Sequence, residues 1–118
     1  EAITAMYDSL VNEGYIDPQT SLEAYKGIFM ETEFKSPVVW MKSQIRLSYL
    51  VHLAFKPENP FDMWVKSVYC FRFPSGKAPS RESMDSNFRA LKKRGTLDTF
   101  DIKLKTIADN YLSSIQKI

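Results

Sequence analysis

The chain has 118 residues, of which 44% are hydrophobic and 25% charged, so its length and composition are those of one ordinary globular domain. Its formal net charge is +2, which is small but unevenly spread along the sequence. Residues 47–55 form the longest uncharged apolar stretch and are too few to span a bilayer. The single cysteine, Cys70, excludes an internal disulfide and favours a reducing, cytoplasmic compartment.

Two helices are predicted at the N-terminal end of the chain. Apolar residues at positions 3, 6, 7, 10 and 11 have helical spacing, and Gly14 is expected to end this first helix. Asp17-Pro18 predicts the start of a second, short helix, because an acid can cap it and proline suits its first position. The inner residues of the second helix are predicted to be Leu22, Tyr25 and Phe29. Residues 31–39 are predicted to form an extended link, because Pro37 disfavours a helix at Ser36.

Four more helices follow. Ser43 is the predicted cap of the third, which has Leu47, Leu50, Val51 and Ala54 inside and stops by Pro57. Asn59-Pro60 starts the fourth, with an inner stripe of Phe61, Trp64, Val65, Val68 and Tyr69. After a loop over residues 72–79, Ser80 caps the fifth, which encloses Met84, Phe88 and Leu91 and ends at Gly95. Asp98 or Thr99 opens the sixth.

The expected fold class is all-α, with about six helices in one compact bundle and residues 1–118 forming a single domain. Residues 38–40 and 69–73 are the only β-leaning pieces, and no alternating strand pattern of useful length occurs. Trp40 and Trp64 are interpreted as core anchors rather than as platforms for stacking on bases. The chain starts at Glu1 without a methionine, so we expect it to be a fragment of a longer protein.

The residues needed for enzymatic chemistry are scarce. A cysteine–histidine dyad would have to join Cys70 to His52, but Cys70 adjoins the apolar face of its helix, where a thiol is more often a core residue. The ligand spacing of a zinc site is missing. Gly76-Lys77 lacks the glycine that a phosphate-binding loop needs five residues earlier. We therefore expect no enzyme activity, no metal and no cofactor.

Charge divides the chain into two parts. Residues 1–34 carry seven acids and one base, a net charge of −6, whereas residues 35–118 carry fifteen bases and seven acids, a net charge of +8. Such asymmetry indicates either a face that binds a polyanion or two parts of the molecule that attract each other. The sequence leaves both interpretations open.

The fifth predicted helix carries the candidate nucleic-acid-binding residues. They avoid the side occupied by Met84, Phe88 and Leu91, and arginine, serine and asparagine are side chains that contact phosphates and base edges. The third to fifth helices could form a helix-turn-helix-like unit whose last helix enters a groove, although loop 72–79 exceeds the usual three- or four-residue turn. A solvated basic face would explain the same residues. The candidates are Arg81, Ser83, Asn87, Arg89, Lys92, Lys93 and Arg94.

The order Trp40, Ser43, Leu47, Leu50, Val51 resembles the C-terminal domain of RteC-type proteins, and related uncharacterised domains, encoded on mobile elements of gut anaerobic bacteria. The resemblance covers at most residues 34–112, and residues 40–51 are its specific part. It implies an all-helical fold and a role in controlling the excision of conjugative transposons through a helix-turn-helix-like DNA-binding domain. Loop 72–79 departs from that pattern, and no individual contact residue is carried over from the family.

These observations together predict a bacterial regulatory domain in the cytoplasm, non-enzymatic, that binds DNA through its basic part. The alternative is a protein-interaction or structural domain with no nucleic-acid role, whose partner would be another protein or a second copy of the chain. An exposed apolar patch or the acidic N-terminal helices would then make the contact.

Overall fold

Short strands accompany the helices in this chain. The structure is a computed structural model, and it describes residues 1–28, 37–54 and 60–116. The elements of this described part, in chain order, are α1 (Ala2–Asn12), α2 (Leu22–Gly27), β1 (Val38–Val39), α3 (Gln44–Ala54), α4 (Pro60–Cys70), β2 (Phe71–Arg72), α5 (Arg81–Lys93) and α6 (Ile102–Gln116). The prediction of a mostly helical fold with about six helices is confirmed for these residues.

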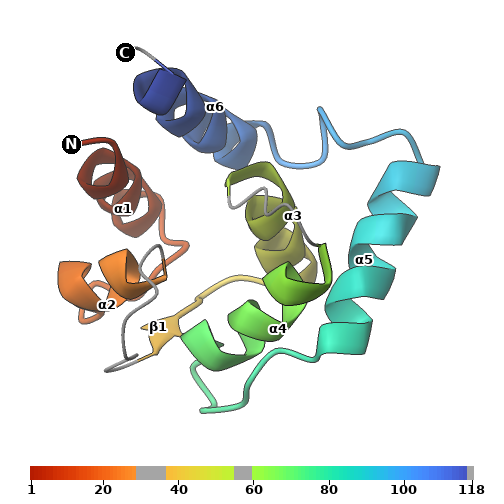
Figure 1. Cartoon of the computed structure of the whole chain (residues 1–118), viewed down its shortest axis with the longest axis horizontal. Coiled ribbons are helices and arrows are strands. Elements are labelled where there is room, and N and C mark those ends of the chain that lie inside the picture. The colour runs from red at the N-terminus through yellow and green to blue at the C-terminus, as the bar shows by residue number, and fades with distance from the viewer. Residues whose placement is uncertain (29–36, 55–59, 117–118) are drawn as a thin grey trace.

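Helix α3 is the centre of the molecule (Figure 1). It packs against α5 on one side and α6 on another, while α1 lies on α6 and α2, and α4 lies on α5. Residues 47–51 are all fully buried, so the middle of α3 is covered on every side rather than along one stripe. The Cα radius of gyration, 13.4 Å, is close to the roughly 13.5 Å expected for a compact chain of this length.

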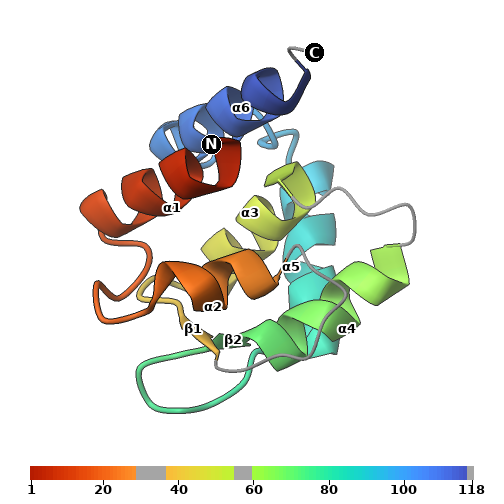
Figure 2. The same cartoon turned by 60° about the vertical axis from the view of Figure 1, so that its left-hand side comes forward.

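The two β-leaning pieces of the sequence pair with each other. Strands β1 and β2 are parallel, with Val38 opposite Phe71 and Val39 opposite Arg72. The N–H of Trp40 extends the ladder by donating to the carbonyl of Arg72 at 2.8 Å, and Trp40 also bridges to Ile16. Each strand is only two residues long, which agrees with the absence of a long strand pattern. The pair ties the segment before α3 to the end of α4 (Figure 2).

Two glycines end helices as predicted. Gly14 and Gly95 have φ angles of +80° and +69°, which non-glycine residues avoid. The N–H groups of Gly14 and Tyr15 donate to the carbonyls of Val11 and Leu10, and those of Gly95 and Thr96 donate to the carbonyls of Lys92 and Leu91. Both helices therefore close with the paired backbone hydrogen bonds of a Schellman motif.

Two predicted helix starts are wrong. Helix α2 begins at Leu22, with the Ser21 hydroxyl accepting from the N–H of Ala24, because Asp17 instead forms a turn in which its carboxylate accepts from the N–H of Gln19. Helix α6 begins at Ile102 rather than after Asp98 or Thr99. Residues 96–100 form turns, and the Asp101 carboxylate accepts from the N–H of Leu104.

The predicted inner stripe of α4 is partly wrong. Trp64 is buried, as expected, but Tyr69 is 66% exposed. The buried side of α4 carries Trp64, Ser67 and Cys70, so the inner face is rotated away from the one predicted. Phe29, residues 31–36, Pro57, Asn59 and the Phe61 side chain lie outside the described residues.

Candidate nucleic-acid interface

The start of α5 is fixed by polar contacts. The Ser80 hydroxyl accepts from the N–H of Ser83 at 3.3 Å, which makes Ser80 the predicted cap. The N–H of Ser80 donates to the side-chain oxygen of Gln44 at 2.9 Å, and Gln44 is the first residue of α3. This contact anchors the beginning of α5 to the beginning of the central helix.

The inner face of α5 is apolar and tightly held. Met84 and Leu91 are fully buried. The Phe88 ring lies between the ring of His52 on α3, at a centroid distance of 4.2 Å, and the ring of Trp64 on α4, at 6.0 Å. Because this face is packed against two helices, the opposite face turns to solvent, and α5 forms an edge of the molecule (Figure 1).

The candidate residues lie in three rows along α5, because residues four and eleven apart share one side of a helix. One flank carries Ser83, Asn87 and, just beyond the last turn, Arg94. The other flank carries Arg81, Asp85 and Lys92. The outward row carries Glu82, Ser86, Arg89 and Lys93. The candidates therefore do not share one face, and Asn87 is half-buried while the other six are exposed.

Positive charge concentrates at the C-terminal end of α5, where each of the three rows ends in a basic residue. Arg89 is paired with Asp85 one turn earlier, so its charge is partly compensated. In the described part of the chain, no ion pair involves Lys92, Lys93 or Arg94. The end of α5 therefore presents three exposed basic groups to solvent.

One basic residue near α5 was not among the candidates. Lys77 lies on the loop between β2 and α5 and is exposed. The sequence favours a solvated turn lysine there, because the Gly76-Lys77 pair fits no phosphate-binding motif. Lys77 lies four residues before Arg81, and the segment from Phe71 to Arg81 contains no acid. This sequence feature could have grouped Lys77 with the basic residues of the helix.

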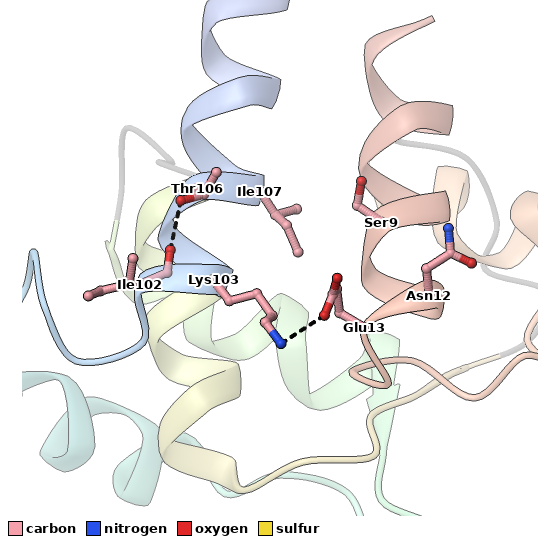
Figure 3. A pocket seen from close by; sticks show the side chains of 7 residues that line it. All are labelled: Ser9, Asn12, Glu13, Ile102, Lys103, Thr106 and Ile107. Atoms are coloured by element: carbon pink, nitrogen blue, oxygen red, sulfur yellow. Dashed lines mark hydrogen bonds and ion pairs between the residues drawn. The ribbon is translucent and has the colours of Figure 1, made fainter.

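The two charged parts of the chain meet between α1 and α6. The Lys103 ammonium lies 2.9 Å from the Glu13 carboxylate, at one end of an open groove of about 660 Å³ that both helices line (Figure 3). Ile102 stands 68% exposed beside it, and Ile107 contributes buried apolar surface. Part of the charge asymmetry is thus satisfied within the molecule.

Both tryptophans are core residues, as interpreted from the sequence. Trp40 is fully buried and its Nε1 donates to the carbonyl of Ser43 at 2.9 Å, and Trp64 is 4% exposed. Neither ring is accessible for stacking on a base. Cys70 is buried as well.

Within residues 1–28, 37–54 and 60–116, no group of three or more histidine, cysteine, aspartate or glutamate side chains is arranged to hold a metal ion. No helix in the same ranges has the length and apolarity that crossing a membrane requires.

Comparison of the chain with protein-family models, with curated proteins and with solved structures yields no match.

Proposed function

We propose that this domain binds duplex DNA through the C-terminal end of α5. The observation that carries the proposal is the set of exposed bases there, Lys92, Lys93 and Arg94, which no described acid neutralises, on a helix whose inner face is locked into the core. Phosphate binding by such bases releases condensed counterions, which supplies sequence-independent affinity. The same function is implied by the resemblance to RteC-type C-terminal domains.

The residues of α5 divide into two roles under this proposal. Lys92, Lys93 and Arg94 contact phosphates, and Arg89 joins them by exchanging its contact with Asp85 for a phosphate oxygen. Ser83 and Asn87 share one flank, and an asparagine amide can pair with the edge of an adenine. Asn87→Ala should therefore change which sequence is preferred, whereas the lysines contribute equally to every sequence.

Titration of a fluorescent duplex at increasing salt tests the proposal. Four phosphate contacts, from Arg89, Lys92, Lys93 and Arg94, give a slope of log affinity against log salt of roughly −3.6. Replacing Lys92 and Lys93 with alanine should flatten that slope by about two. The matched control replaces Lys26 and Lys103 with alanine, which removes the same charge from two ion-paired residues on α2 and α6. This control should leave the slope unchanged.

A second candidate function is a protein-interaction or structural role without nucleic acid. The contact between Lys103 and Glu13 favours it, because that ion pair is what two mutually attracting parts of a chain would form. Under this alternative, the purified protein shows no salt-dependent binding to any duplex at low ionic strength. That result would rule out the DNA proposal.

A further inference from the structure

We propose that α5 lies across the major groove of a B-form duplex, with bases at each of its ends contacting a different phosphate backbone. Lys77 and Arg81 would contact one strand, and Lys92, Lys93 and Arg94 the other. This inference rests on the proposed function and deepens it, because it adds a second contact point and specifies the groove in which α5 lies.

Lys77 is held in place by its loop. The N–H of Phe73 donates to the carbonyl of Lys77 at 2.9 Å, and the N–H of Gly76 donates to the carbonyl of Phe73 at 2.8 Å. Gly76 has a φ of +89°, which lets the chain reverse there. Figure 2 shows this loop projecting from the body of the molecule. Lys77 thus lies on a hydrogen-bonded turn rather than on an extended segment without internal hydrogen bonds.

The loop and the start of α5 form one unit. Pro79, between Lys77 and Arg81, is buried, and the N–H of Ser80 is bound by the Gln44 side chain. These anchors fix where the loop leaves the core and where α5 begins. Arg81 is the first residue of α5 and Lys77 precedes it by four residues, so these two bases lie at the N-terminal side of the helix, whereas Lys92, Lys93 and Arg94 lie at its C-terminal end.

The length of α5 suits a groove-spanning position. Its thirteen residues extend over about 18–20 Å at a rise of 1.5 Å per residue. The major groove of B-DNA is about 12 Å wide, so the two ends of a helix laid across it reach the phosphates on either side. A helix lying along a single strand would instead carry its bases in one continuous row.

The charge order along the helix follows the same geometry. Bases occupy both ends, Glu82 stands beside Arg81 in the first turn, and Asp85 and Ser86 lie between the ends together with Arg89, which is paired with Asp85. Acids are repelled by phosphates, but a carboxylate over the groove floor can accept from the amino group of cytosine. Asp85 therefore lies over the groove in this arrangement, where the backbone is farthest away.

The form of nucleic acid follows from groove shape. The major groove of an A-form RNA duplex is deep and narrow and does not admit protein side chains. A single strand has no pair of backbones at a fixed separation. The chain should therefore bind a DNA duplex at least about tenfold more tightly than an RNA duplex or single-stranded DNA of the same sequence at equal salt.

The experiment compares three double variants of the full chain on a mixed-sequence DNA duplex of about two helical turns. Lys77→Gln/Arg81→Gln removes one basic end, Lys92→Gln/Lys93→Gln removes the other, and Lys26→Gln/Lys103→Gln is the control. Each end variant should reduce the magnitude of the salt slope by about two, and the control should not change it. Urea unfolding of each variant verifies that it is folded before its binding is interpreted.

The outcomes separate this inference from the proposed function. If Lys92→Gln/Lys93→Gln flattens the slope and Lys77→Gln/Arg81→Gln does not, the helix does not span the groove, although DNA binding stands. Equal affinity for DNA and RNA duplexes would also overturn the spanning arrangement. Absence of binding by the parent chain to any duplex would overturn both proposals.

Discussion

At the scale of single residues, Leu50 shows how completely the centre of α3 is enclosed. Leu50 is fully buried and shares one core with Trp64 of α4, as the apolar stripes of the two helices predict. Truncation of Leu50 to alanine removes buried methyl groups and leaves a cavity, so we expect a loss of about 2–5 kcal/mol in the free energy of unfolding. Urea denaturation measures this loss.

The control for Leu50→Ala is Ile102→Ala. Ile102 is 68% exposed, and its truncation should change the free energy of unfolding by less than about 0.5 kcal/mol. A loss below half a kcal/mol for Leu50→Ala would show that the Leu50 side chain does not pack in the core.

Gly95 is a second position where one residue decides the local structure. Its φ of +69° lies in the left-handed region, and an added Cβ would meet no atom within 4 Å. Gly95→Ala should therefore lower the free energy of unfolding only through backbone strain in the left-handed conformation, by about 1–2 kcal/mol. Thermal or urea unfolding measures this loss. Ser86→Ala, on the exposed side of the same helix, should be neutral or slightly stabilising. Equal effects for the two variants would argue against the left-handed helix end.

At the scale of elements, Asp101 joins three parts of the chain. Its carboxylate accepts hydrogen bonds from the Tyr15 hydroxyl at 2.9 and 2.8 Å, from the Arg46 Nε at 3.1 Å, and from the N–H of Leu104 at 3.0 Å. These donors come from the segment after α1, from α3 and from the first turn of α6. One side chain thus caps α6 and fixes its angle to two other elements.

Asp101→Ala should therefore lose more stability than removal of an ordinary helix cap. It removes the cap of α6 and leaves the buried Tyr15 hydroxyl without its acceptor, so we expect a loss of about 2–4 kcal/mol. Asp98→Ala, at the exposed position where the sequence predicts the helix start, should cost less than about 0.5 kcal/mol. A double-mutant cycle with Tyr15→Phe measures the coupling energy between Asp101 and Tyr15. If the two losses of stability are additive, the Tyr15 hydroxyl does not depend on the Asp101 carboxylate.

The helix boundaries show which signals a sequence carries. Ser80 marks the start of α5 and Gly95 marks its end, each through hydrogen bonds with the same helix. Such local contacts can be predicted from residue types. Asp17 and Asp98 look like helix starts on the same criteria. The N–H of Asp17 is instead bound by the carbonyl of Val39, a partner distant in sequence, and Asp101 is selected over Asp98 by its contacts with Tyr15 and Arg46.

The candidate interface was predictable to a similar extent. The basic end of α5 follows from Lys92-Lys93-Arg94 together with a helix end at Gly95, which are local features. The half-burial of Asn87 and the closed turn that holds Lys77 depend on packing and on loop geometry. Helical periodicity alone does not distinguish a flank that faces solvent from one that partly contacts a neighbouring helix.

At the scale of the whole molecule, the acidic and basic parts of the sequence lie next to each other in the fold. The acidic N-terminal part contributes α1 and the basic part contributes α6, and the two helices lie side by side (Figures 1 and 2). The contact between Glu13 and Lys103 joins them, whereas the bases at the end of α5 lie on a different edge. Attraction between the two parts and a separate basic edge therefore coexist, and the duplex titration addresses only the second.

Buried tyrosines give the whole fold a pH dependence above neutrality. Burial, followed by the hydrogen bond to the Asp101 carboxylate, raises the pKa of Tyr15. Burial likewise raises the pKa of Tyr25, Tyr49 and Tyr111. A raised pKa means that the folded protein retains these protons at a pH where the unfolded chain releases them, at a tyrosine pKa of about 10. Their contribution to stability is therefore fully present below about pH 10.

That contribution is lost as the pH rises from about 10 through the folded pKa values, because ionisation then favours the unfolded chain. Each such tyrosine can lower the free energy of unfolding by up to about 1.4 kcal/mol per pH unit in this range. Urea midpoints between pH 8 and pH 11, with tyrosinate absorbance followed in parallel, measure the loss. Tyr15→Phe should be less stable than the parent at pH 8 but should show a shallower decline, since one of the four groups is gone. A stability that stays flat from pH 9 to 11, or a decline as steep in Tyr15→Phe as in the parent, would contradict the burial of the Tyr15 hydroxyl against Asp101.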